Sequence, residues 1–193
     1  MTDKLNLIFL DFDGVLNSER SNVAYTAHQH GNIGWKPEGL DEVAVLLVKR
    51  LAVEGQAKVV ISSSWREFFP DEQLAKFLAK KGWHDCPIIG RTPKLNFVTM
   101  YSNSYSGSFR GNEVAAFLED FVQKGNEVGT WVILDDSKDF HYGETAMGGF
   151  RSKQPVVNTD ARVGFSLKNF YDALKILDPS HTFLDDLEMR LLP

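Results

Sequence analysis

Two aspartates at the end of an apolar run are the residues of this chain best suited to chemistry. Asp11 and Asp13 follow the run Leu5–Leu10 and precede Gly14. Such a run is typical of a buried strand in a parallel sheet, and ligands of these sheets bind beyond the carboxyl ends of the strands. Neighbouring carboxylates repel each other unless a cation lies between them, and a hard divalent cation is the usual partner. The pattern predicts a magnesium site with a nucleophilic carboxylate.

Two further apolar runs end in polar residues of a similar kind. The run Ala57–Ile61 leads into Ser62, and the run Trp131–Leu134 leads into Asp135 and Asp136. Adjacent parallel strands lie about 4.8 Å apart, so we expect the polar residues after the three runs to form one site. A carboxylate nucleophile, a hydroxyl and metal-binding carboxylates together suit phosphoryl transfer through an aspartyl phosphate.

Segments with helical spacing of apolar residues separate these runs. Helices are predicted at 40–53, 71–81, 114–122 and 167–177, with short strands at 87–89 and 155–157. Strands that alternate with helices predict an α/β fold, namely a Rossmann-like three-layer α/β/α sandwich around a central parallel sheet. We expect residues 1–177 to form one domain, with a flap or loop at 17–36 and a substrate-side loop at 92–110. The tail, 178–193, would pack on this body or on a partner subunit.

Composition limits the function classes. The 193 residues are 43% apolar, which suffices for one buried core, and the net charge of −5 gives no general attraction for nucleic acid or anionic membranes. The single cysteine, Cys86, excludes an internal disulfide. No apolar segment reaches membrane-spanning length and no signal-peptide pattern precedes the first strand. A cytoplasmic protein that does not contact membranes is expected, and a homo-oligomer is left open.

The ordered motifs resemble those of the haloacid dehalogenase (HAD) superfamily of phosphatases. The segment 11–16 (DFDGVL) is similar to its first motif, 61–62 (IS) to its second and 134–136 (LDD) to its fourth. The stretches 61–66 (ISSSWR) and 110–118 resemble a subgroup related to the phosphatase domains of nucleic-acid-repair proteins. The resemblance covers about residues 5–177 and implies a magnesium-dependent phosphomonoester hydrolase.

The resemblance also assigns roles to individual residues. It implies that Asp11 is the nucleophile and that Asp13 is first the general acid and then the general base. Metal would be held by the Asp11 carboxylate, the Asp13 backbone carbonyl and a carboxylate of Asp135 or Asp136. Asp136 is favoured as the direct ligand, with Asp135 behind it. Ser62 would bind a phosphoryl oxygen.

The family's third motif is normally a lysine, and here the chain departs from the pattern. Arg110 occupies that place, and Lys94 is the alternative. Arg110 is favoured, since arginine stays charged and binds phosphate bidentately. Trp65 either lines the pocket or packs beneath it. The residues assigned to substrate binding are Ser63, Ser64, Arg66 and Lys94.

The predicted substrate follows from the absence of a large cap domain at either usual insertion point. In this superfamily an open site accompanies large substrates such as nucleic-acid ends, or closure by a second subunit. The negative net charge opposes extended phosphate binding, although loop residues can supply a local basic patch, namely Lys36, Arg66, Arg91, Lys94, Arg110, Arg151 and Lys153. The alternatives are a nucleotide or other small-molecule phosphatase and, less favoured, a non-catalytic phosphate-binding module. Dehalogenation is disfavoured because Asp13 and the Asp135–Asp136 pair are present.

Overall fold

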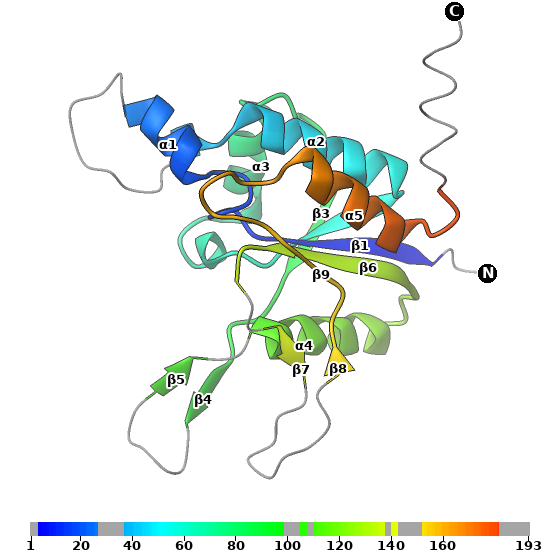
Figure 1. Ribbon diagram of the computed structural model, residues 1–193. Coiled ribbons are helices and arrows are strands. Elements are labelled where there is room, and N and C mark those ends of the chain that lie inside the picture. The colour runs from blue at the N-terminus through cyan, green and yellow to red at the C-terminus, as the bar shows by residue number, and fades with distance from the viewer. Residues whose placement is uncertain are drawn as a thin grey trace, which may run out of the picture.

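A five-stranded parallel sheet forms the centre of the protein (Figure 1). The computed structural model describes residues 4–26, 37–98, 105–107, 110–137, 140–142 and 152–181. In spatial order the strands are β3 (Ile88–Arg91), β2 (Ala57–Ile61), β1 (Leu5–Leu10), β6 (Val128–Asp135) and β9 (Val156–Asn158). Every neighbouring pair is parallel, as the alternation of strands and helices predicts.

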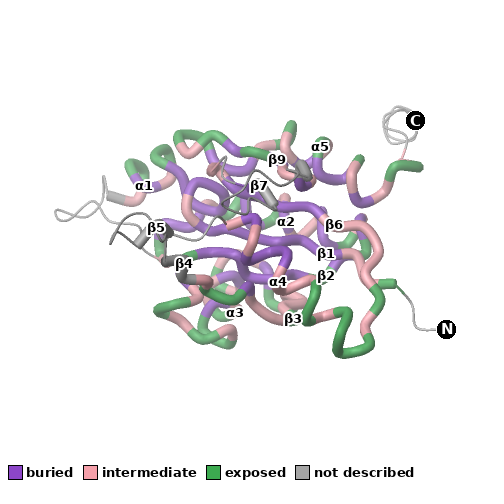
Figure 2. Tube along the Cα trace, turned by 90° about the horizontal axis from the view of Figure 1, so that it is seen from below, coloured by how far each residue is buried: buried purple, intermediate pink, exposed green. Residues whose placement is uncertain are grey.

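Helices cover both faces of this sheet. Ile8 and Leu10 of β1 pack in the larger hydrophobic cluster with α2 (Glu42–Glu54), α3 (Asp71–Ala79) and α5 (Leu167–Leu177). Leu7 and Phe9 point to the opposite face, where α4 (Arg110–Gln123) packs (Figure 1). Side chains alternate between the faces of a strand, so β1 serves both clusters and is buried in its carboxyl-terminal half (Figure 2). The predicted three-layer α/β/α architecture is confirmed, and no large cap is present among the described residues.

Local signals set the helix ends. The side chain of Asp41 accepts hydrogen bonds from the backbone N–H groups of Val43 and Ala44, which caps α2. Ser166 and Asn169 form a capping box at the start of α5. The four predicted helices are all present, with ends shifted by up to four residues.

Five short elements, one helix and four strands, were not predicted. A helix, α1 (Glu19–Thr26), lies within the segment predicted as a flap or loop, and reciprocal hydrogen bonds between Ser18 and Ser21 hold its first turn. Within 92–110, β4 (Asn96–Val98) and β5 (Tyr105–Gly107) pair as an antiparallel hairpin. Further along the chain, β7 (His141–Tyr142) pairs antiparallel with β8 (Ser152–Lys153). None of these segments carries a long periodic apolar pattern, which is why the sequence did not reveal them.

Some expectations concern residues beyond the described ranges. The rest of the flap at 27–36 and the tail from 182 onward lie outside them. The helix α5 ends at Leu177, and the N–H of the next residue, Asp178, donates to the Leu174 carbonyl. None of the described helices combines the length and the apolar character that a membrane span requires.

Candidate active site

Four polar residues form a row along the carboxyl edge of the sheet. In strand order β6, β1, β2, β3 they are Asp135, Asp11, Ser62 and Thr92. The backbone N–H groups of Asp11, Ser62 and Thr92 donate to the carbonyls of Leu134, Leu10 and Ile61 on the neighbouring strands, at 3.0, 2.9 and 2.9 Å. The parallel register therefore continues to these residues. By the alternation of side chains, all four residues belong to the face that α4 covers. The structure therefore places Asp11, Ser62 and Asp135 side by side at one edge of the sheet, as the sequence pattern predicts.

Arg110, the first residue of α4, bridges this row. Its Nη1 lies 2.9 Å from Asp11 Oδ2 and 2.9 Å from Asp135 Oδ2, and its Nη2 donates to the Ser62 carbonyl. Lys94, the alternative cation, forms an ion pair with Glu67 at the surface. Of the two candidates, Arg110 is therefore the one in contact with the predicted catalytic carboxylates.

Three carboxylates converge beside Arg110. Asp11, Asp135 and Asp136 each offer one oxygen, and these atoms lie within 4.8 Å of one another. Gly14, with φ of 73°, permits this approach, because a Cβ at that position would lie 2.5 Å from the Asp136 carboxylate. Three carboxylates exceed the charge of one guanidinium, and all-oxygen donor sets suit Mg²⁺. The residues present therefore fit a divalent cation.

The acid–base properties of these carboxylates reflect the same crowding. Burial and the charge of Asp11 raise the pKa of Asp135 to about 8, although the guanidinium of Arg110 acts in the opposite direction. Burial and Asp11 also raise the pKa of Asp136. Burial and crowding thus disfavour the charged forms of Asp135 and Asp136, and a bound divalent ion would favour them.

The Asp13 side chain is held by two hydrogen-bond donors. Trp65 Nε1 donates to Oδ2 at 2.9 Å, and Asn17 Nδ2 donates to Oδ1 at 3.0 Å. The Trp65 ring packs on Phe12, with ring centroids 5.1 Å apart, so the donor is fixed by the core. Burial raises the pKa of Asp13, and the two hydrogen bonds partly offset this effect. Trp65 therefore both packs beneath the site and contacts it.

Two hydroxyl groups of the row are buried without a protein partner. In the described part of the chain, Ser62 Oγ and Thr92 Oγ1 have no hydrogen-bond partner. A buried unpaired hydroxyl is unfavourable unless a ligand or water satisfies it. The arrangement suits oxygen atoms of a bound anion. Thr92 was not among the sequence candidates, although it follows β3 as Ser62 follows β2.

The remaining sequence candidates lie in the turn after β2. Ser63 Oγ accepts from the Trp65 N–H and caps a 3₁₀ turn, η2 (Ser64–Glu67), whose first residue, Ser64, is exposed. The Arg66 guanidinium forms a buried ion pair with Glu113 at 2.6 Å and donates to the Ser63 carbonyl. Glu113 was not among the predicted site residues either, although it lies on α4 three residues after Arg110.

Comparison with known proteins gives one family. Residues 7–170 match the model of the HAD domain in Swiss Army Knife RNA repair proteins. No curated protein and no solved structure matches the chain. The matched region contains the whole carboxylate cluster, Arg110 and both unpaired hydroxyl groups.

Proposed function

The chain belongs to the family of HAD domains in Swiss Army Knife RNA repair proteins, and we propose that it is a magnesium-dependent phosphomonoesterase that acts on nucleic-acid ends. The family implies a hydrolase of the HAD superfamily. The observation that carries the proposal is the position of Asp11 between an arginine, an unpaired serine hydroxyl and two further carboxylates.

The proposed reaction assigns one role to each of these side chains. An oxygen of Asp11 attacks phosphorus, the bond to the leaving oxygen breaks, and Asp13 protonates that oxygen. Arg110 and the Ser62 hydroxyl bind the non-bridging phosphoryl oxygens. Asp13, now deprotonated, takes a proton from the water that attacks the aspartyl phosphate, which releases phosphate and restores Asp11.

Mg²⁺ would be held by Asp11 and Asp136, with Asp135 behind them and the Asp13 carbonyl as a further ligand. Arg110 and the Ser137 N–H, at 2.8 Å, already contact Asp135, which favours Asp136 as the direct ligand. When bound, the ion neutralises negative charge between the carboxylates and the phosphoryl group.

A test of the function compares phosphate release from 3′-phosphorylated oligonucleotides, 5′-phosphorylated oligonucleotides and mononucleotides. With Mg²⁺ we expect turnover of at least one oligonucleotide to exceed that of the mononucleotides, and excess chelator to abolish it. Turnover that persists in chelator would exclude the metal mechanism. A preference for mononucleotides would indicate the small-molecule alternative, and failure to turn over any phosphomonoester would indicate a non-catalytic module.

Trp65→Phe tests the positioning of Asp13, because it keeps an aromatic ring and removes the N–H donor. Since that hydrogen bond lowers the pKa of Asp13, its loss should raise the pKa further. The acidic form then persists to higher pH, so we expect the basic limb of kcat/KM to move to higher pH and the maximum to fall about tenfold. Trp131→Phe, which changes a tryptophan that packs on Phe9, is the control. An unmoved pH profile would show that Trp65 only packs.

A further inference from the structure

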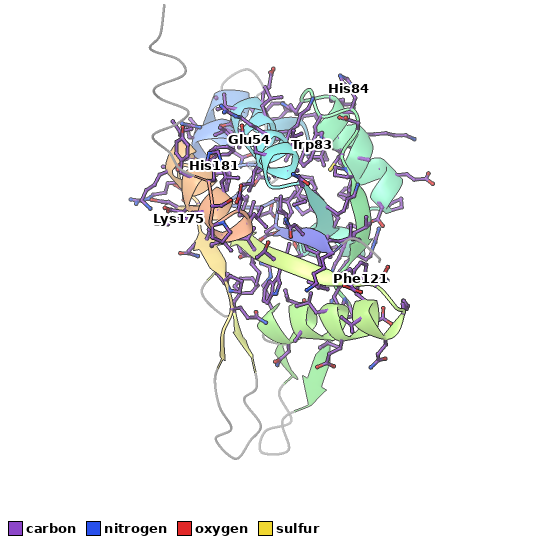
Figure 3. The ribbon with its side chains drawn as sticks, turned by 90° about the vertical axis from the view of Figure 1, so that its right-hand side faces the viewer. Glu54, Trp83, His84, Phe121, Lys175 and His181 are labelled. Carbon is purple, nitrogen blue, oxygen red and sulfur yellow. The ribbon has the colours of Figure 1, made fainter. Side chains whose placement is uncertain are left out.

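A groove of about 870 Å³ lies between the edge strand β3 and α4. Among the described helices, α4 alone covers this face, and it packs on β1, β2 and β6 (Figure 1). Gly90 of β3 lets the Phe117 ring pack closely on the strand, since a Cβ at residue 90 would lie only 3.1 Å from that ring. Phe121 lies on the side of α4 that faces the sheet (Figure 3).

One end of the groove meets the catalytic row. Thr92 lines the groove and is the neighbour of Ser62 along the sheet edge. Its hydroxyl is buried and unpaired, as that of Ser62 is. Arg66 also lines the groove, and it donates to the carbonyl of Ser63, which follows Ser62 directly. The groove is therefore continuous with the proposed phosphate site.

The lining combines aromatic surface with positive charge. Phe117 and Phe121 stack on each other at 5.6 Å, and both are partly exposed. Four cations and two carboxylates line the groove, which gives the lining residues a net charge of +2 in a chain of net charge −5. Two of the cations, Arg66 and Arg91, are paired with the carboxylates of Glu113 and Asp71, which lie outside the lining. The cations are Arg66, Arg91, Lys94 and Lys124, and the carboxylates are Glu67 and Asp120.

The cations differ in their freedom to change partners. The ion pairs of Lys94 with Glu67 and of Lys124 with Asp120 are largely exposed, whereas that of Arg66 with Glu113 is buried. Exposed ion pairs contribute little to stability, so a phosphate group can replace the carboxylate partner of either lysine. Stacked aromatic rings beside mobile cations are what proteins use to bind single-stranded nucleic acid.

We propose that this groove binds the single-stranded segment next to the terminal phosphate, which extends the proposed function by a second binding site. A base stacks on Phe121, backbone phosphates contact Lys94 and Lys124, and the Thr92 hydroxyl donates to an oxygen of the terminal nucleotide.

The test is binding of a fluorescein-labelled single-stranded RNA octamer with a 3′-phosphate, followed by anisotropy. Asp11→Asn protein prevents turnover during the measurement. In this background Phe121→Ala and Lys124→Glu should each weaken binding about tenfold, and Phe121→Tyr should restore it. Lys124→Glu should also reduce the slope of log K against log salt by about 0.7. Lys168→Glu on α5, the matched charge reversal away from the groove, should bind like the parent protein.

Two further results separate this proposal from the proposed function. If the parent protein and both groove variants bind the octamer equally, the groove is not the RNA-binding site, even if the enzyme is an active phosphatase. Groove-dependent binding by a protein that hydrolyses no phosphomonoester overturns the catalytic function alone. When Asp11 is left unchanged, each groove substitution should lower kcat/KM for the octamer about tenfold and leave kcat/KM for an aryl phosphate nearly unchanged.

Discussion

Asp11→Asn is expected to lower phosphate release from an aryl phosphate by at least about 10³-fold. The substitution keeps the size of the side chain and removes the charge that makes it a nucleophile. It also removes one of the three carboxylates that lie within 4.8 Å of one another. The rise in Tm on addition of Mg²⁺ should therefore be smaller than in the wild type.

The control for this variant is Asp172→Asn. Asp172 lies on α5 and forms an exposed i,i+4 ion pair with Lys168, so its neutralisation should leave both activity and the Mg²⁺ response unchanged. Retention of more than about a tenth of wild-type activity by Asp11→Asn would exclude an aspartyl phosphate at this position.

The sequence predicted which edge of the sheet holds the candidate site, because in three strands a polar residue directly follows the apolar run. In parallel pairing the carboxyl ends of neighbouring strands lie at the same edge of the sheet. Asp11, Ser62 and Asp135 are therefore neighbours because β1 pairs with both β2 and β6. Arg110 was predicted less directly, from its place in the family pattern. The structure adds the geometry, namely that one guanidinium contacts both Asp11 and Asp135.

Contacts between side chains from distant elements were beyond the sequence. Trp65 and Asp13 are 52 residues apart, and their hydrogen bond depends on how the indole ring packs against Phe12. Glu113 was noted only as part of the resemblance over 110–118, yet it forms a buried ion pair with Arg66. Such partners are decided by rotamers and packing, which residue types and spacing do not specify.

The short elements were missed for a different reason. The strands β4 and β5 have three residues each and pair with each other, which is too short for a periodic apolar pattern. The helix α1 likewise has little apolar asymmetry between its faces, and its first turn depends on Ser18 and Ser21. Segments this short leave little trace in the sequence pattern.

Arg110→Ala should lower kcat/KM for an aryl phosphate by about 10²–10³-fold, because a cation that contacts the developing charge is lost. Asp11 and Asp135 would then lack their shared guanidinium, and the pKa of Asp135 should rise further. In the absence of divalent metal we therefore expect a lower Tm, and a larger rise in Tm on addition of Mg²⁺ than in the wild type.

Two comparison variants make the role of Arg110 specific. Arg110→Lys should recover part of the activity, since an ammonium supplies the charge but not the planar fork that reaches two carboxylates and the Ser62 carbonyl. Lys94→Ala removes the competing cation, whose ion pair with Glu67 is exposed, and should change aryl phosphate turnover less than about threefold. If Lys94→Ala has the larger effect, the phosphate-binding cation comes from the loop after β3, and the contacts of Arg110 serve the carboxylates alone.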